Sequence, residues 1–338
     1  MNEALNKLAV DFFENSLNSS PTSAIMRGYT EYFDQIEELT EARFDQNLQD
    51  LNNFDKRLSE INFDELSNKE KVTFGMLEYA FTSNKDSLLD RSWEFGAGVS
   101  GFTGYLIDYN QQMFIPDLES ADLLLKRLEL YNQFFNQISK VQKKGLYENR
   151  VATERNLLRT IDQIESYLKT SLENDPLLLV NFSSEVSQGD LNDWKDKAKL
   201  IIESNVRPSV NLYLEQLKTE HLPKGRSDTN PGIMWIEGGE DIYLRSLRKF
   251  TGNKDISVKE VHEVGLSEIE RLKKEFFEIG KNVFEDVTTP EEVLYKMQTE
   301  PSMRYESKEQ MLQMAEDIIE RAYKPLADWF TVFPKAPC

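Results

Sequence analysis

Residues 238–284 read GGEDIYLRSLRKFTGNKDISVKEVHEVGLSEIERLKKEFFEIGKNVF, and they contain two helical patterns separated by a sharp turn. Ser257 and Glu260 have the spacing of a capping box, in which a hydroxyl and a carboxylate bind the first free N–H groups of a helix. Behind them, residues of one face recur at alternating spacings of three and four, which predicts a long amphipathic helix. That stripe is formed by His262, Gly265, Ile269, Leu272, Phe276, Ile279 and Val283.

The same helical spacing continues over the rest of the chain. The alternation with a period of two that marks a strand is not convincing anywhere, the short segment Leu177–Phe182 being its best candidate. We therefore predict an all-α fold, an elongated multi-helix bundle of about ten to twelve helices. The predicted helices are Thr40–Ile61, Val72–Phe81 behind a capping box of Ser67 and Glu70, Leu118–Lys144 ended by Gly145, Arg150–Thr170, Leu191–His221 kinked at Pro208, the helix behind Ser257, a shorter one begun by Thr289 and Pro290, and a last one capped by Ser307 and Gln310 and interrupted by Pro325.

Two long irregular loops separate these helices, Trp93–Pro116 and His221–Glu240. Loops of this length in a helical protein usually line a site or cover a core. The first loop contains Gly96–Gly101, which fits the dinucleotide-binding pattern G-x-G-x-x-G. That pattern needs a buried strand before it, and Lys85–Glu94 is too polar for one. We therefore predict a flexible or backbone-contacting loop and no nucleotide site.

The composition is that of an acidic globular protein. Of its 338 residues 39% are hydrophobic, enough for a large core, and we predict a single helical domain over residues 1–338. A net charge of −19 repels phosphate backbones and anionic lipids, so we expect no nucleic-acid and no membrane partner. The acidic N-terminus, MNEALNKLAVDFFENSL, lacks the basic start and apolar core of a signal peptide, which favours the cytoplasm.

Residues 238–284 resemble blocks of the bacterial family called "domain of unknown function 885", and the resemblance runs over nearly the whole chain. Residues 238–243, GGEDIY, are similar to its Gly-Glu-x-x-Tyr block, although Ile242 stands where the family often has a first tyrosine. Residues 248–251, RKFT, are similar to its Leu-Arg-basic-x-Thr turn. Residues 261–266, VHEVGL, are similar to its Ile-His-Glu-Leu-Gly-Leu block.

The resemblance implies an all-helical zinc-dependent peptidase, whose metal motif is a His-Glu pair followed by Pro-Gly-His downstream of these blocks. This chain ends at Cys338 without that motif, so we expect it to be the N-terminal, substrate-shaping half of such an enzyme. A peptide substrate is then expected, and zinc only in a full-length relative. Tyr243, Arg248 and His262 are the substrate-binding candidates, and no residue is assigned a catalytic role. The alternative for Tyr243 and Arg248 is structural, as capping and packing residues. Because some relatives are similar to exported or lipid-anchored proteins, the resemblance leaves the location open.

The residues themselves do not predict a metal site. His262 and Glu263 begin like the zinc motif His-Glu-x-x-His, but Leu266 occupies the position of the second histidine. The only other histidine, His221, lies in a predicted loop. We therefore expect no metal and no cofactor in this chain. The favoured interpretation of His262 is a partly buried helix residue with hydrogen-bonded ring nitrogens.

The C-terminal residues are unusually apolar. Trp329, Phe330 and Phe333 lie close to the last residue, which is the single cysteine. Exposed apolar residues of this kind promote association, so we expect them to pack on a missing C-terminal half or to cause self-association. The alternative is a non-catalytic helical binding or scaffold protein that ends naturally at Cys338. The substrate and the oligomeric state do not follow from the sequence.

Overall fold

The computed structural model describes residues 2–96 and 109–332 of the chain. The chain divides into two compact units, unit 1 (Met1–Asp255) and unit 2 (Ile256–Cys338). Whether both units fold as the single domain that we predicted stays a prediction. The caps and cores of the two units are therefore described separately.

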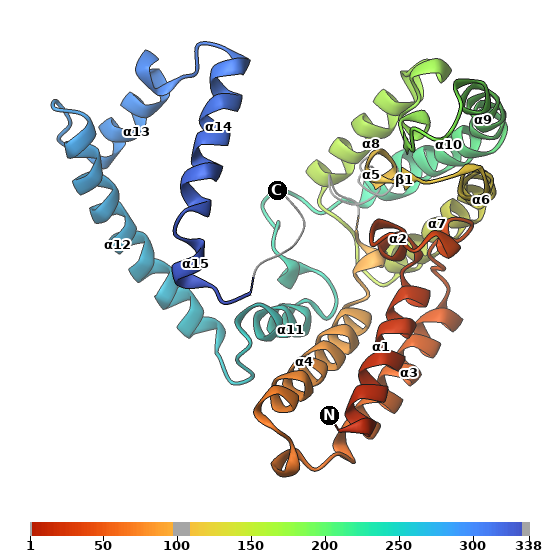
Figure 1. The fold of residues 1–338 in the computed structure, drawn as a ribbon, viewed down its shortest axis with the longest axis horizontal. Helices are drawn as coiled ribbons and strands as arrows, with labels where there is room; N and C mark the ends of the chain where they lie inside the picture. Colours follow the sequence, from red (N-terminus) through yellow and green to blue (C-terminus); the bar gives the residue numbers. More distant parts are fainter. Residues whose placement is uncertain (1, 97–108, 333–338) are drawn as a thin grey trace. The chain divides into compact units, whose positions relative to one another are not determined.

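Helices dominate both units, and twelve α-helices of the described residues have ten residues or more (Figure 1). The predicted all-α fold is therefore confirmed. No helix within the described ranges is both long and apolar enough to cross a membrane. The α-helices of unit 1 are α1 (Glu3–Ser19), α2 (Pro21–Met26), α3 (Glu41–Ser59), α4 (Asn68–Asp90), α5 (Tyr109–Gln112), α6 (Leu118–Glu129), α7 (Tyr131–Tyr147), α8 (Glu154–Lys169), α9 (Gln188–Ile201), α10 (Arg207–Gln216) and α11 (Gly239–Thr251). Those of unit 2 are α12 (Val258–Val283), α13 (Pro290–Thr299), α14 (Lys308–Tyr323) and α15 (Leu326–Trp329). The described strands, β1 (Phe114–Ile115) and β2 (Asn181–Phe182), form one short parallel pair.

The helix starts lie where the capping residues predict them. Thr40 accepts a hydrogen bond from the Arg43 N–H at the start of α3, and Thr289 forms a capping box with Glu292 at the start of α13. In the box at α4, the hydroxyl and N–H of Ser67 both donate to Glu70. Together with the N–H of Asn2, these donors lower the pKa of Glu70 to about 2. Local hydrogen-bonding chemistry is therefore enough to place these ends.

The predicted helix Leu118–Lys144 is wrong in two respects. It is divided at Leu130, because α6 packs against α9 whereas α7 packs against α10, and one straight helix cannot meet both partners. Its second part also continues past Gly145 to Tyr147. The turn is made by Asn149, whose φ of 57° is left-handed, and the Arg150 N–H then donates to the Gly145 carbonyl oxygen at 2.8 Å.

Gly145 has a packing function instead. A Cβ there would lie 2.6 Å from the carbonyl oxygen of Glu94 and 3.0 Å from that of Arg150. We expect Gly145→Ala to lower the free energy of unfolding by about 1–3 kcal/mol, because backbone must move to admit the methyl group. Urea unfolding followed by circular dichroism measures this.

The control for Gly145→Ala is Gly75→Ala in α4, where nothing lies within 4 Å of the new Cβ. This variant is expected to gain about 0.5–1 kcal/mol from helix propensity. If both variants changed stability in the same direction, the close approach at Gly145 would not limit packing.

The predicted helix Leu191–His221 is helical throughout but is not uniform. Two π-helical turns, Ile202–Val206 and Leu217–His221, flank α10. Pro208 stands in the first turn of α10, directly after the first π turn. Because proline has no N–H and crowds the preceding turn, the wider π turn accommodates it without ending the helix. His221, predicted to lie in a loop, belongs to the second π turn and is buried.

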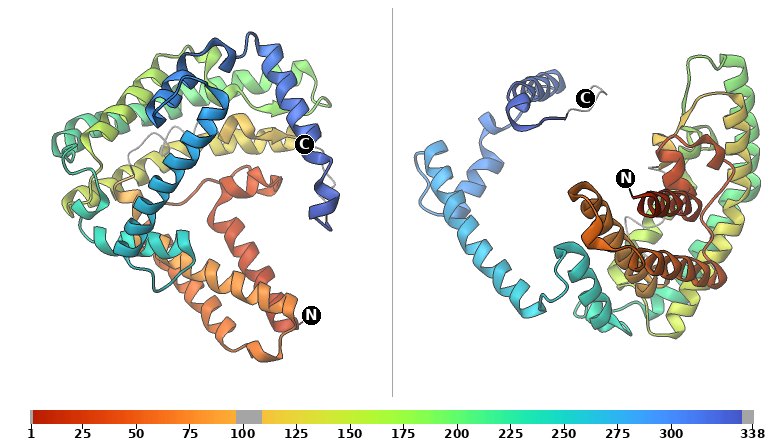
Figure 2. Two further views of the ribbon diagram at one scale, coloured as in Figure 1. Left: turned by 90° about the vertical axis from the view of Figure 1, so that its left-hand side faces the viewer. Right: turned by 60° about the horizontal axis from the view of Figure 1, so that its bottom comes forward.

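Unit 1 has two hydrophobic cores. In the first, α1, α3 and α4 lie side by side, as the views of Figure 2 show, and bury Phe54 and Phe81 between them. The second, larger core gathers residues of α2, α6–α10 and the β1–β2 pair. Trp194 is buried there and donates its indole N–H to the Ala121 carbonyl oxygen at 2.9 Å. The two cores fix the ends of α4 and α7, which flank the cavities described below.

Unit 2 buries few apolar residues among those described. Its core consists of Phe284, Val287 and Val293, and Gly280 makes it feasible because a Cβ there would lie 2.4 Å from Val293. No residue of α14 is buried. The exposed apolar residues of α12, α14 and the segment behind them include Leu266, Ile269, Leu272, Ile279, Val283, Met311, Leu312, Ile318, Ile319, Trp329 and Phe330. We call the exposed part of the α12 stripe, Ile269, Leu272, Ile279 and Val283, the apolar face of α12.

Candidate functional site

The loop before α11 brings that helix against α4. Gly238 caps the helix in a left-handed conformation with φ 71°. Gly239 follows it, and a Cβ there would lie 1.9 Å from the carbonyl oxygen of Ile233. Two consecutive glycines are therefore required at this turn, which gives a physical reason for the pair Gly238-Gly239. Ile242, one turn into the helix, is buried.

A cavity of about 500 Å³ lies between α4 and the C-terminal end of α11. Its charged lining consists of three bases, Arg248, Lys249 and Lys254, and two acids, Glu78 and Asp86. A helix C-terminus attracts cations, so the bases are favoured at this end of α11. We call this space the Arg248 cavity.

The acids of the Arg248 cavity hold its bases only loosely. Arg248 lies 3.7 Å from Asp86, and Lys254 lies 3.5 Å from Glu78. At 3.7 Å the Arg248 guanidinium makes an ion pair but no hydrogen bond with Asp86. Burial raises the pKa of Asp86 above its ordinary value, opposed by the positive charges of Arg248 and Arg245. The guanidinium therefore keeps N–H donors for a carboxylate ligand.

A buried ion pair fixes the frame of this cavity. The Arg150 Nε donates to Glu94 at 2.7 Å, and both side chains are almost fully buried. Further guanidinium N–H groups of Arg150 donate to the carbonyl oxygens of Glu237 and Asp90. Arg245 on α11 forms an ion pair with the Asp90 side chain. Together these contacts join the end of α4 to the loop before α11 and to α11 itself.

The three predicted site residues do not form one group. Arg248 lines the cavity, with its side chain 44% exposed. Tyr243 is exposed and does not line the cavity, because five residues turn a helix by roughly 140° and so place it on another face. His262 lies in unit 2 on α12 and is exposed, so the interpretation of a partly buried, hydrogen-bonded ring is wrong. Whether any of them binds substrate stays a prediction.

The described residues do not fit a zinc ion. No group of three His, Cys, Asp or Glu side chains close enough to hold a metal is found among residues 2–96 and 109–332. His221 is buried, its Nδ1 lies 3.3 Å from the Gln216 carbonyl oxygen, and its Nε2 has no hydrogen-bond partner in the described part of the chain.

Several predictions fall on segments outside the described residues. The glycine pattern Gly96–Gly101 lies there apart from its first residue, as does half of the loop Trp93–Pro116. The same holds for Phe333 and Cys338. The second loop, His221–Glu240, is described, and it contains short helical turns at Leu222–Lys224 and Ile233–Trp235.

The sequence reasoning missed the acids that face Arg248 and the partner of Arg150. Glu94 and Arg150 are 56 residues apart, and no local pattern links them. Asp86 and Glu78 had a weak signal, because they lie eight residues apart on α4, which is about two turns, and so on one face. Pairing them with α11 requires the tertiary structure.

Comparisons with known proteins identify relatives of the whole chain. The profile of a family described as "Bacterial protein of unknown function (DUF885)" matches residues 21–338. Among solved structures, the chain is similar to the crystal structure of a "putative lipoprotein from Colwellia psychrerythraea", with 17% sequence identity and a TM-score of 0.80. The match covers 98% of this chain and 61% of that chain, so this chain spans about three-fifths of that protein's length. At this identity the likeness shows the fold alone. No curated protein matches the chain.

Proposed function

This chain belongs to the DUF885 family of bacterial proteins of unknown function, and from that premise we propose that it shapes the substrate site of a zinc-dependent peptidase. In this proposal the chain supplies peptide-binding side chains, and the zinc ligands come from a further polypeptide segment. No step of the reaction is assigned to residues of this chain.

The observation that carries the proposal is the Arg248 cavity. Arg248 is a predicted site residue, it lines a cavity of about 500 Å³, and its guanidinium makes no hydrogen bond with Asp86. A planar guanidinium binds a carboxylate through two parallel hydrogen bonds, which suits the C-terminal carboxylate of a peptide. Lys249 and Lys254 add positive charge beside it.

The exposed apolar residues of unit 2 support the need for a further segment. Monomeric proteins rarely expose extended apolar surface, and such surface usually binds another protein surface. About two-fifths of the matched lipoprotein chain has no counterpart in this one. We propose that a segment of that kind covers the apolar face of α12 and brings the metal ligands.

Reading the coding DNA past codon 338 tests this part of the proposal directly. An in-frame segment that encodes a His-Glu pair followed by Pro-Gly-His supports it, and the longer protein should then hydrolyse peptides with zinc bound. A stop codon directly after codon 338 would favour the second candidate, a non-catalytic helical scaffold that binds a partner through the same apolar face.

Arg248→Ala tests the substrate-binding role on the chain as it stands. We expect the affinity for tri-alanine with a free C-terminal carboxylate to fall about 10- to 100-fold, because a charge-assisted hydrogen bond contributes about 1.5–3 kcal/mol. Isothermal titration calorimetry measures the dissociation constant.

Two controls accompany Arg248→Ala. Arg159→Ala removes an exposed arginine of α8 and should leave the affinity unchanged. Tri-alanine amide lacks the carboxylate. Its affinity for the parent chain should be about as low as the affinity of tri-alanine for Arg248→Ala. Equal affinity of acid and amide for the parent chain would contradict a carboxylate site at Arg248.

The apolar face of α12 makes a separate prediction. The parent chain is expected to bind a hydrophobic dye and to self-associate. The double variant Leu272→Glu with Ile279→Glu should bind much less dye and self-associate much less, since charge opposes apolar contact. These side chains are 52% and 63% exposed, so the double variant should keep its fold. Sedimentation velocity and dye fluorescence measure the difference.

The charge-matched control places the same two substitutions off the stripe, at Ser267 and Asn282, which are exposed on α12. This control should associate like the parent. A parent chain that stays monomeric and does not bind dye at high concentration would contradict an unpartnered apolar face.

A further inference from the structure

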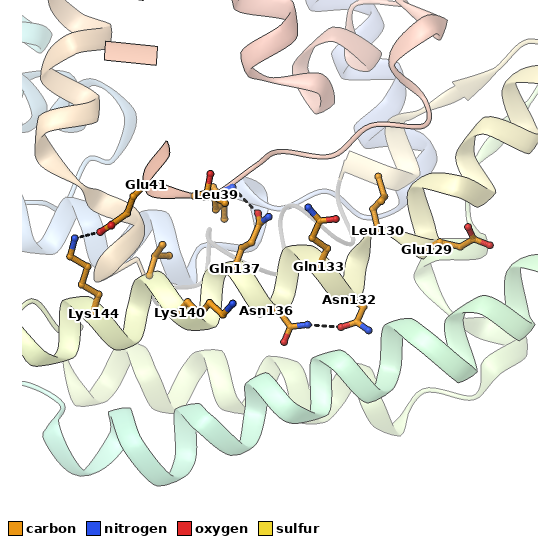
Figure 3. A pocket seen from close by; sticks show the side chains of 12 residues that line it. Leu39, Glu41, Glu129, Leu130, Asn132, Gln133, Asn136, Gln137, Lys140 and Lys144 are labelled. Carbon is orange, nitrogen blue, oxygen red and sulfur yellow. Dashed lines mark hydrogen bonds and ion pairs between the residues drawn. The ribbon is translucent and has the colours of Figure 1, made fainter. Parts of the chain in front are cut away.

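Two neighbouring cavities lie along α7 in unit 1, apart from the Arg248 cavity. The first has a volume of about 800 Å³ and is lined by α7, by the segment Leu39–Glu41 and by Glu129 (Figure 3). The second, of about 360 Å³, lies between α3, the end of α4 and α7. Both are lined by Glu41, Val141 and Lys144, so they adjoin. We call the two together the α7 groove.

Side-chain amides line the first cavity. Asn132, Gln133, Asn136 and Gln137 come from successive turns of α7, and Figure 3 shows them along the same stretch of the helix. Residues four apart on a helix lie one above the other, so the two asparagines and the two glutamines form parallel rows. Each amide offers two donors and an acceptor. Such rows match the alternating N–H and C=O groups of an extended backbone.

One amide of the row already binds main chain in this way. The Gln137 Oε1 accepts a hydrogen bond from the Leu39 N–H at 2.8 Å, within the non-helical segment that precedes α3. Asn136 donates to Asn132 at 2.7 Å. Gln133 and Lys140 line the same cavity, and no hydrogen bond of either side chain is found in the described ranges. The row therefore has unused donors and acceptors. The bond between Gln137 and Leu39 shows the kind of main-chain contact that they can make.

The second cavity combines apolar side chains with charged ones, which are Glu41, Asp45, Arg91, Glu94 and Lys144. Leu88, Leu89 and Trp93 line it, and the Trp93 ring stacks on Phe44 with 3.8 Å between centroids. Each ring covers one face of the other, and both side chains stay partly exposed. A large apolar side chain of a ligand can pack against these apolar residues.

We propose that the α7 groove binds an extended peptide, whose backbone pairs with the amide row and whose apolar side chain enters the second cavity beside Trp93. From Asn132 to Lys144, α7 rises by about 18 Å. At about 3.3 Å per residue, this length takes roughly five residues of extended chain. The site is separate from the Arg248 cavity, so it stands whether or not the proposed peptidase function holds.

The test uses fluorescein-labelled Ser-Ala-Ser-Ala-Phe with an amidated C-terminus, which has no carboxylate for Arg248. Fluorescence anisotropy against rising concentrations of the whole chain should show saturable binding. Gln133→Leu with Asn136→Leu should weaken it about tenfold, because two backbone hydrogen bonds are lost. Both residues are exposed, so the variant is expected to fold, and circular dichroism checks this.

The matched control is Gln188→Leu with Asn192→Leu, which removes an exposed glutamine and an exposed asparagine, four residues apart, from α9. It should bind like the parent, and a peptide with Ala in place of Phe should bind about tenfold more weakly because the apolar contact is lost. If the peptide does not bind at millimolar chain concentration, the proposal is overturned. It is also overturned if Gln133→Leu with Asn136→Leu binds the peptide as tightly as the parent chain does. Tighter binding of maltopentaose than of the peptide, measured by competition, also overturns it and assigns the groove to a carbohydrate.

Discussion

Replacing Arg150 with methionine is expected to lower the free energy of unfolding of unit 1 by about 3–5 kcal/mol, the usual cost of breaking a buried ion pair on one side. Glu94 is 3% exposed and, among the described residues, would keep its ion pair with Arg91 alone. The carbonyl oxygens of Asp90 and Glu237 would also lose their donor. Urea unfolding measures the change through the fluorescence of Trp93, Trp194 and Trp235, in a Trp329→Phe background that leaves tryptophan only in unit 1.

The matched control for Arg150→Met is Arg155→Met, five residues further along the chain. Arg155 forms an ion pair with Asp228 at 2.6 Å, and the two side chains are 62% and 48% exposed. A surface pair of this kind contributes about 0–1 kcal/mol. If both variants lost the same small amount, Arg91 alone would compensate the buried charge of Glu94, and the proposed frame of the Arg248 cavity would not depend on Arg150.

The second large effect is expected at Phe81 in the core of α1, α3 and α4. Phe81 is fully buried, and its ring lies 4.9 Å from Phe12 and 5.8 Å from Phe54, measured between centroids. We expect Phe81→Ala to cost about 3–5 kcal/mol, because transfer free energy is lost and a cavity remains. The same fluorescence measurement applies, and the slope against urea concentration reports whether compactness also changes.

Met76→Ala is the control for Phe81→Ala because Met76 lies on the same helix and is 67% exposed. A surface substitution of this kind should change stability by no more than about 0.5 kcal/mol. A cost at Phe81 as small as that at Met76 would mean that α4 does not depend on this core. The packing of α4 in this core would then not hold the lining of the Arg248 cavity in place.

The sequence predicted the features that depend on neighbouring residues. The hydroxyl caps at Thr40, Ser67, Ser257, Thr289 and Ser307 start helices in the structure, because an N-cap bonds to N–H groups two or three residues away. Apolar periodicity predicted the all-α class for the same reason, since it reports only which face of a helix is buried. The blocks around residues 238–266 were sufficient to indicate the family.

The sequence failed where distant segments decide the outcome. Gly145 has the residue type of a helix terminator, but its missing side chain serves the approach of Glu94, which is 51 residues earlier. Leu130 carries no breaking signal, and the chain bends there because α6 and α7 pack on different helices. Both cases depend on shapes that meet only after folding, and no local preference encodes them.

The candidate sites follow the same division. The sequence alone determined the all-α class, the hydroxyl caps of five helices, the family and Arg248 as a residue of interest. Only the tertiary structure decided that Arg248 faces Asp86 in a cavity, that Tyr243 does not line it, and that the amides of α7 line a groove. The physical reason is that helix formation depends on contacts within about four residues, whereas a cavity exists only where surfaces from distant parts of the chain pack incompletely.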